Sequence, residues 1–233
     1  MINEESWIFK PYKRISKREL KQDKFVTMTI KAKEYMEGHS RTIMWGTVAL
    51  LAVILIISFM ARSKRQANVK ANELLGKATF TLSQGNMQQG ETQLKELIDN
   101  YSGVTAAGQG CFLLAKYYWQ KNDYANAKIY FEKYIDDYSG DELLTAAAYA
   151  GYGDCLSQEG KTMEAAQNYE KAARVDKESP QTPAYLYSAA QAYLTASNLE
   201  KAQALAQEIV KDHDKSEYKN KAEILISMLK MKA

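Results

Sequence analysis

The sequence predicts an all-α protein in which a single N-terminal transmembrane helix precedes an α-solenoid of about four repeats with a C-terminal capping helix. Three observations support this fold class: an uncharged run of 20 residues, self-similarity with a period of about 37 residues after that run, and apolar residues at helical spacing. The expected domains are a basic cytoplasmic tail with an amphipathic helix (1–41), a transmembrane helix (42–61), a basic juxtamembrane linker (62–70), four repeats (71–217) and a capping helix (218–233).

The uncharged run reads TIMWGTVALLAVILIISFMA and lies between Arg41 and Arg62. A helix of this length, at about 1.5 Å per residue, reaches roughly 30 Å, the thickness of a bilayer's hydrocarbon core. A buried core helix is one alternative, but nothing else in the chain is apolar enough to surround the run. A cleaved signal peptide is the other. The long preceding region and the sequence Ser58-Phe59-Met60-Ala61, which is not a small-x-small cleavage site, argue against it.

Charge on the two sides of the run indicates its orientation. The tail (1–41) contains 10 Lys and Arg against 6 Asp and Glu, whereas the body (72–233) contains 17 against 22. Because positively charged segments are retained in the cytoplasm, this asymmetry predicts a cytoplasmic N-terminus and a body outside the cytoplasm. Residues 62–70, directly after the run, are about as basic as those directly before it, so charge alone leaves the orientation open.

The tail is predicted to contain a basic amphipathic helix. Ser16-Lys17-Arg18-Glu19 has the Ser-x-x-Glu form of a capping box, apolar residues recur at helical spacing from Phe25 to Met36, and Gly38 can end the helix. Such a helix is typical of a segment that lies along the inner leaflet, and a docking helix for a membrane partner is the alternative. Basic residues on both sides of the run are expected to contact anionic lipid headgroups. They are Lys21, Lys24, Lys31, Lys33, Arg62, Lys64 and Arg65.

The body repeats itself. Residues 96–103 (ELIDNYSG) and 133–140 (KYIDDYSG) are near copies with an offset of 37 residues, and 208–215 (EIVKDHDK) is a looser copy 75 residues further on. Self-similarity at a fixed period of this length predicts stacked structural units that bury their apolar faces against their neighbours.

The pattern within each period resembles the tetratricopeptide repeat. The second period shows the pattern best, with Cys111, Leu114, Ala115, Tyr118, Tyr124, Ala127, Phe131 and Tyr134. The resemblance implies a pair of helices per period, in which large residues of one helix fill notches left by Ala and Gly on the other. The last segment, from Tyr218, is expected to cap the array. Its inward residues should be Ala222, Ile224, Leu225, Met228 and Leu229.

By repeat phase, one stripe of each first helix should line the concave face of the array. This stripe comprises Phe112, Lys116, Trp119, Asp154, Ser157, Tyr187, Gln191 and Leu194. A large aromatic residue on a concave repeat surface is typical of an anchor for a peptide or partner, which makes Trp119 the most informative member. The alternative is that Trp119 packs under an adjacent loop. We take the stripe as the candidate partner-binding site.

Other classes of function find no support in the sequence. A net charge of +3, with basic residues clustered around the run, does not indicate a nucleic-acid-binding protein. Cys111 and Cys155 are too few for a disulfide framework and are expected to pack as small side chains, with a single bridge as the alternative. Zinc-binding, phosphate-loop and nucleophile-elbow motifs are lacking, and the Asp136-Asp137 pair has no glycine-centred loop of a calcium site. We therefore predict a non-enzymatic interaction protein that needs no cofactor, metal or small-molecule substrate.

The layout of tail, span, repeat array and final Met- and Lys-rich helix (226–232) resembles the bacterial YfgM-like family of ancillary Sec translocon subunits. The resemblance implies an inner-membrane protein with a cytoplasmic N-terminus and periplasmic repeats. It further implies partners among translocon membrane proteins and an associated periplasmic chaperone. The tail is longer and more basic than the family's brief lead-in, and the repeats follow the general consensus more closely. The alternative is a structural or adaptor subunit of another cell-envelope assembly, joined through its span and tail.

Overall fold

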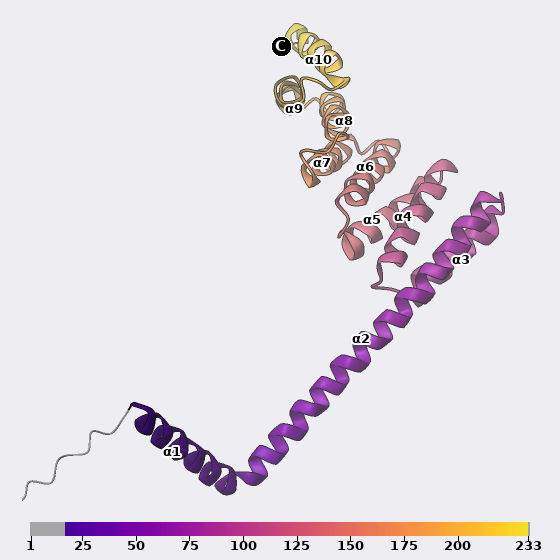
Figure 1. Cartoon of the computed structure of the whole chain (residues 1–233). Coiled ribbons are helices and arrows are strands. Elements are labelled where there is room, and N and C mark those ends of the chain that lie inside the picture. The colour runs from indigo at the N-terminus through magenta and orange to yellow at the C-terminus, as the bar shows by residue number, and fades with distance from the viewer. Residues whose placement is uncertain (1–16, 233) are drawn as a thin grey trace, which may run out of the picture. The chain divides into compact units, whose positions relative to one another are not determined.

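The computed structural model describes residues 17–232, with side chains from residue 24 to 231. All regular elements in that part of the chain are α-helices, ten in number, so the predicted all-α class is confirmed (Figure 1). The chain consists of two units, Met1–Arg62 and Ser63–Ala233.

The first unit begins with α1, Lys17–Gly38, which ends at the glycine that the sequence predicted. The capping residue Ser16 and the side chain of Lys21 lie outside the described residues. The predicted amphipathic character is wrong, because the apolar residues of α1 are spread around the helix. At about 100° per residue around the helix axis, Val26 and Ile30 lie roughly 100° and 140° from Phe25. They are therefore outside the predicted apolar stripe that contains Phe25.

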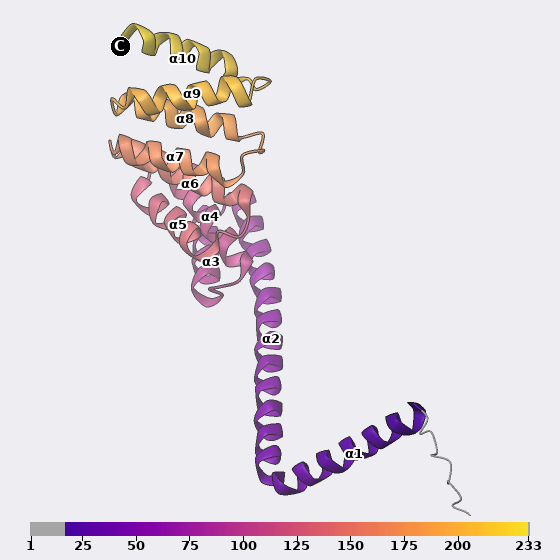
Figure 2. The same cartoon turned by 90° about the vertical axis from the view of Figure 1, so that its left-hand side faces the viewer.

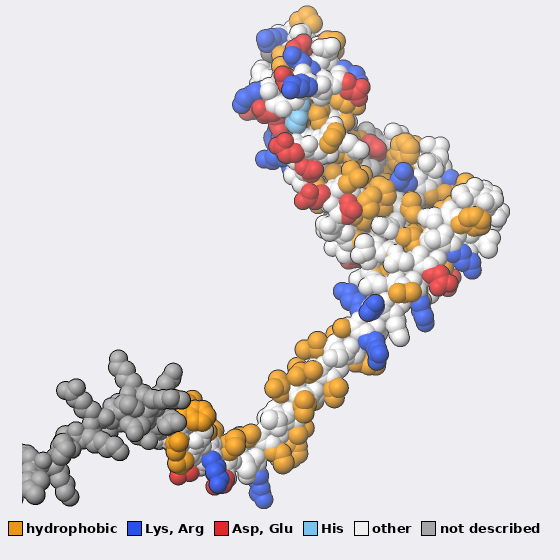
Figure 3. Space-filling view, in the orientation of Figure 1, with side chains coloured by type: hydrophobic (Ala, Val, Ile, Leu, Met, Phe, Trp, Pro, Cys, Tyr) orange, Lys and Arg blue, Asp and Glu red, His pale blue; other side chains and the backbone are white. Residues whose placement is uncertain are grey.

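The helix α2, Ser40–Ser83, contains the apolar run. It is the helix, within the described part of the chain, that is long and apolar enough to cross a membrane, and none of its most apolar window is buried in protein. The buried-core alternative therefore finds no support. Figure 3 shows hydrophobic side chains covering this stretch, with basic side chains at both ends. The expected linker at 62–70 is helical instead, since it contains neither Gly nor Pro and is rich in helix formers.

The second unit is a stack of helix pairs. The C-terminal end of α2 packs against α3, where a Cβ at Gly90 would lie 2.4 Å from Cδ2 of Leu82. From α3 onward, successive helices lie side by side in antiparallel order (Figure 2). Their bounds are α3 Met87–Asn100, α4 Thr105–Gln120, α5 Tyr124–Tyr138, α6 Glu142–Gln158, α7 Thr162–Val175, α8 Thr182–Thr195, α9 Leu199–Asp212 and α10 Tyr218–Lys232. The pairs α2/α3, α4/α5, α6/α7 and α8/α9 are the four predicted repeats.

Each turn within a pair contains one residue at positive φ, always at the same repeat phase. These residues are Gly85, Asn122, Gly160 and Ser197, with φ of 82°, 59°, 77° and 61°. Gly tolerates this left-handed conformation without a Cβ clash, and Asn adopts it more readily than most residues. The next residue is the N-cap of the second helix. The side chains of Asp123 and Asn198 at this position accept hydrogen bonds from the backbone N–H groups of Asn126 and Lys201.

Neighbouring helices approach closely where a glycine faces a large side chain. A Cβ at Gly108 would lie 2.7 Å from both Cβ and Cγ of Tyr138, and one at Gly151 would lie 2.4 Å from Cζ of Phe131. Tyr138 and Phe131 both belong to α5, so α5 fills notches in its own partner helix α4 and in α6 of the next repeat. These contacts join two repeats into one core.

Polar contacts also join consecutive repeats. The hydroxyl of Tyr118 donates to Glu91 of the previous repeat at 2.5 Å, and that of Tyr193 donates to Glu170 at 2.8 Å. Lys128 pairs with Glu159, and Arg174 forms a two-pronged pair with Glu208. Lys95, Lys128 and Arg174 lower the pKa values of Glu91, Glu159 and Glu208 respectively.

The capping helix α10 buries three of the five residues that were predicted to face inward. Ala222, Leu225 and Leu229 are buried as expected, but Ile224 is 61% exposed and Met228 is 44% exposed. Residues 222, 225 and 229 follow the three–four spacing of one helix stripe, and positions 224 and 228 lie outside that stripe. The outer side of the cap therefore carries Ile224 and Met228 among charged and polar side chains.

The glycine notches predict opposite effects for one substitution at different sites. Gly108→Ala should lower the free energy of unfolding by about 1–3 kcal/mol, because atoms next to the Tyr138 backbone cannot swing away. Gly151→Ala should cost less, since it meets the tip of the Phe131 ring. Gly76 lies two periods before Gly151, at the same phase, and a Cβ added there would have nothing within 4 Å.

Gly76→Ala should therefore raise the free energy of unfolding by up to about 1 kcal/mol through helix propensity. Urea unfolding of the full chain in detergent, followed by circular dichroism, measures all three variants. Equal effects at Gly76 and Gly108 would contradict the notch packing.

Candidate partner-binding surface

The first helices of the repeats lie along one side of the second unit. Figure 1 shows α4, α6 and α8 on this side and α5, α7 and α9 on the other. In agreement, α4 contacts α6 and α8 contacts α10, although neither pair is consecutive in the chain. We call the side formed by α4, α6 and α8 the concave face. The predicted stripe lies on these three helices.

Trp119 and Lys116 are exposed on the last two turns of α4. The Trp119 side chain is 41% exposed, which favours an available anchor over a ring packed beneath a loop. Lys116 forms no ion pair with the described residues, and its Nζ lies 6.0 Å from the centre of the Phe112 ring. This part of the face offers a large aromatic surface next to an unpaired positive charge.

Phe112 contributes more to packing than to the surface. Its ring is half-buried and packs edge-on against Phe131 and Tyr134 of α5, with ring centres 5.9 Å apart in both cases. Such pairs are stabilised beyond the area they bury. The sequence pattern could not show that the Phe112 ring packs against two aromatic rings of α5.

Asp154 is a half-buried carboxylate on α6. Its Oδ1 accepts a hydrogen bond from the hydroxyl of Tyr169 on α7 at 2.6 Å. Burial raises the pKa of the Asp154 carboxyl, and the Tyr169 hydrogen bond offsets only part of this effect. No Lys or Arg side chain among the described residues forms an ion pair with Asp154. Its charge is therefore held in a partly desolvated place with one hydrogen bond and no ion pair.

Tyr187 and Gln191 occupy the corresponding positions on α8. The Gln191 side-chain amide donates to the Tyr187 hydroxyl at 3.2 Å, and the Tyr187 ring lies 5.7 Å from that of Tyr218 at the start of α10. Gln191 is exposed, and Tyr187 and Leu194 are half-buried. These residues provide polar and aromatic surface at the far end of the concave face.

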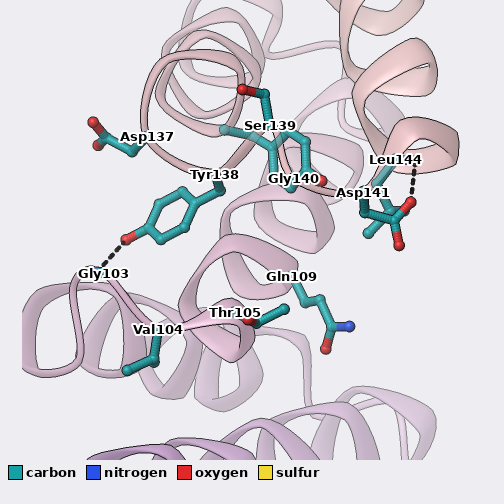
Figure 4. Close-up of a pocket in the computed structure, with 11 residues that line it drawn as sticks. Gly103, Val104, Thr105, Gln109, Asp137, Tyr138, Ser139, Gly140, Asp141 and Leu144 are labelled. Carbon is teal, nitrogen blue, oxygen red and sulfur yellow. Dashed lines mark hydrogen bonds between the residues drawn. The ribbon is translucent and has the colours of Figure 1, made fainter. Parts of the chain in front are cut away.

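The structure also contains a cavity that the sequence did not indicate. It has a volume of about 700 Å³ and opens between the loops that join the first three repeats (Figure 4). It is lined by Gly103, Val104, Thr105, Gln109, Tyr134, Asp137, Tyr138, Ser139, Gly140, Asp141 and Leu144. The only hint in the sequence is the repeated Tyr-Ser-Gly at 101–103 and 138–140, whose Tyr138 hydroxyl accepts from the Gly103 N–H across this cavity.

The residues expected at the membrane surface are exposed wherever their side chains are described. Lys24, Lys31 and Lys33 lie on α1, and Lys33 is 3.8 Å from Glu37. Arg62, Lys64 and Arg65 lie on α2 directly after the apolar run. Their contact with anionic lipid stays a prediction.

Reactive chemistry is not assembled in the described part of the chain. Cys111 and Cys155 are free and fully buried, as the packing interpretation predicted, and burial raises the pKa of each thiol to about 12. A thiol with such a pKa is not a thiolate at neutral pH and is a poor nucleophile. Within the described residues, three or more His, Cys, Asp and Glu side chains do not gather in any metal-binding group.

The comparisons with known families agree with this geometry. The model of the tetratricopeptide repeat-like domain matches residues 33–150, half of the chain and a range that includes the apolar run. A tetratricopeptide repeat model matches residues 153–217. The chain belongs to the tetratricopeptide repeat-like domain family, whose fold is typically a scaffold for binding other proteins.

Solved structures share the fold over 70% of this chain. A tetratricopeptide repeat protein from Parabacteroides merdae has a TM-score of 0.57 at 15% identity, and this chain covers 60% of its length. The nearly identical TPR-like repeats of a Podosopora anserina kinesin light chain-type protein have a TM-score of 0.50 at 14% identity, with 94% of that chain covered. An ArsTM double mutant of MamA from RS-1 has a TM-score of 0.50 at 16% identity, with 96% covered. Among curated proteins, no sequence matches.

The environment of Asp154 predicts a gain in stability when its charge is removed. Asp154→Asn keeps an oxygen that can accept from Tyr169, so the free energy of unfolding should rise at pH 7. A raised folded-state pKa means that the penalty grows as pH rises above the ordinary Asp value of 3.8 and vanishes below it. The gain should therefore disappear in acid.

Thermal unfolding of the full chain between pH 3 and 7 measures this difference. The matched control is Asp136→Asn on α5, an exposed carboxylate whose removal should leave the unfolding temperature unchanged. A loss of stability in Asp154→Asn at pH 7 would show that the ionised carboxylate is needed for the fold.

Proposed function

We propose that the protein is a membrane-anchored tetratricopeptide scaffold whose concave face binds a segment of a partner protein. The observation that carries this proposal is the exposed Trp119 beside the unpaired Lys116 on α4. An exposed Trp on a repeat surface is a typical binding anchor. Contact with a partner removes a large apolar area from water, and the rigid side chain loses little conformational entropy.

The anchor of the scaffold is the apolar part of α2. A helix with 20 uncharged residues and no protein cover is stable in a bilayer, where its backbone groups bond to one another. Anchoring confines the repeats to a thin layer near the membrane. Weak contacts with other membrane-bound proteins are then strengthened by the high local concentration.

We further propose that the scaffold is an ancillary subunit at the exit side of the Sec translocon. The N-terminus would be cytoplasmic and the repeats periplasmic. Partners would be translocon membrane proteins, an associated periplasmic chaperone or emerging secreted chains. The tail, span and repeat order that resemble the YfgM-like family support this proposal, as does the charge difference between the tail and the body.

A second function is favoured by the first repeat. Phe80 on α2 is 64% exposed, whereas the residues at the same phase in the next three repeats, Tyr117, Cys155 and Ala192, are 8%, 0% and 9% exposed. Val69, on the same side of α2, is 64% exposed. A structural or adaptor subunit of another envelope assembly could use this face, the span and the tail for its contacts.

Substitutions on the two faces distinguish the candidates. Trp119→Ala and Lys116→Glu should each lower recovery of cross-linked partners at least fivefold, because they remove the anchor and reverse its neighbouring charge. The matched control is Ile129→Ala on α5, which is 55% exposed on the opposite side of the unit. Quantitative mass spectrometry after cross-linking in membranes measures recovery.

If translocon components are recovered equally with the wild type and both α4 variants, the concave face is not the binding site. A loss confined to Phe80→Ser would favour the adaptor function instead.

The orientation predicts which reagent reaches the repeats. A single cysteine at the exposed Gln158, in a Cys111→Ala and Cys155→Ala background, should be labelled in intact cells by a maleimide that cannot cross the inner membrane. A cysteine that is protected until the cells are lysed would place the array in the cytoplasm and exclude the translocon-exit assignment.

A further inference from the structure

The carboxylate of Asp154 differs from the three described carboxylates whose pKa is lowered by an ion pair. Glu91, Glu159 and Glu208 each have a described Lys or Arg partner that lowers the pKa. Asp154 has only the Tyr169 hydroxyl, which engages Oδ1, and no described donor engages Oδ2. It is also the one of the four that lies on the concave face. The ion-pairing capacity of this carboxylate is therefore unused in the free protein.

We propose that the concave face selects partner segments that carry a lysine or arginine, which Asp154 binds as an ion pair. This inference rests on the proposed scaffold function and specifies the chemistry of its partner. A half-buried carboxylate that has lost part of its hydration and has no cation beside it carries a free-energy penalty. The approach of a cationic side chain reduces that penalty. A hydrogen-bonded ion pair of this kind contributes mainly to specificity.

Small side chains occupy the other positions on the Asp154 stripe of α6, and burial, together with the nearby Asp154 charge, raises the pKa of Tyr185 on α8. The other α6 residues at concave-face phases are small: Ala147, Ala150 and Ser157. The residues that correspond to Ala150 and Ser157 are large: Phe112 and Trp119 on α4, and Tyr187 and Leu194 on α8. The aliphatic stem of a lysine or arginine can lie along such apolar surface while its charged end reaches the carboxylate.

Lys116 adds a second charge to the pattern. Lys116 occupies the same repeat position on α4 as Asp154 does on α6. It has no ion-pair partner among the described residues. Packed helices lie about 8–10 Å apart, a distance that about three residues of extended chain span at roughly 3.3 Å each. The preferred segment should therefore carry an acidic residue about three positions from its basic residue.

A purely structural role for Asp154 makes a different prediction. If the carboxylate serves only to accept from Tyr169, an asparagine can replace it in the fold and in binding alike. Asp154→Asn therefore separates the negative charge from the hydrogen bond. Asp136→Asn on α5 is the matched control, since it removes an equal charge from the opposite side of the unit.

The test measures peptide binding by the full chain in nanodiscs, using fluorescence anisotropy. The probes are ten-residue labelled peptides with aromatic and aliphatic residues and a Glu three positions from one variable position. That position holds Lys, Arg or the neutral norleucine. Wild type and Asp136→Asn should bind the Lys and Arg peptides about tenfold more tightly than the norleucine peptide. In Asp154→Asn this ratio should fall to about one.

Two other results would overturn the inference. If wild type binds all three peptides equally while Trp119→Ala weakens every one, the concave face binds partners without the proposed charge selection, and the scaffold function stands. If no peptide binds to any variant, both the charge selection and the peptide-binding face are wrong.

Discussion

The structure of the repeat unit depends on close approach between helices at glycine notches. Tyr138 lies against Gly108 and Phe131 lies against Gly151, so one helix, α5, holds both its own partner and the next repeat. Repeats of a stacked array bury their apolar faces against their neighbours. Large side chains that enter a neighbour's notch bury area in two repeats at once, which makes the stack cooperative. The polar links from Tyr118 to Glu91 and from Tyr193 to Glu170 cross the same kind of boundary.

This packing leaves one side of the first helices free to vary. Residues that face a partner helix are held to Ala, Gly or a matching large residue. The concave positions carry Lys116, Asp154 and Gln191 at one common phase, a cation, an anion and a neutral amide. The fold does not require such a sequence of charges. Different charges at the same position of successive repeats allow the surface to distinguish one partner segment from another.

The ends of the array show what stacking normally hides. Phe80 in the first repeat has the phase of the buried Tyr117, and Ile224 and Met228 lie on the outer side of the cap. Terminal repeats of a soluble solenoid usually present polar outer faces. Here both ends keep apolar side chains, and the first end continues directly from the helix that contains the apolar run. The exposure of Phe80 follows from the absence of a preceding repeat within the described residues.

The sequence by itself determined the helical class, the apolar run and the period of the repeats. These properties depend on local periodicity and on residue size, which any single chain displays. Only the tertiary structure decided that Phe112 is half-covered by Phe131 and Tyr134, that Ile224 faces outward, and that Asp154 has no cationic partner. Each depends on which side chain of another helix reaches the residue, and spacing within one helix carries no such information. The helical character of 62–70 and the scattered apolar residues of α1 could have been predicted from the sequence but were not. The lack of Gly and Pro in 62–70 indicates a helix, but its basic charge led to the prediction of a linker. The positions of Val26 and Ile30 argue against an amphipathic α1, but a partial apolar stripe led to that prediction.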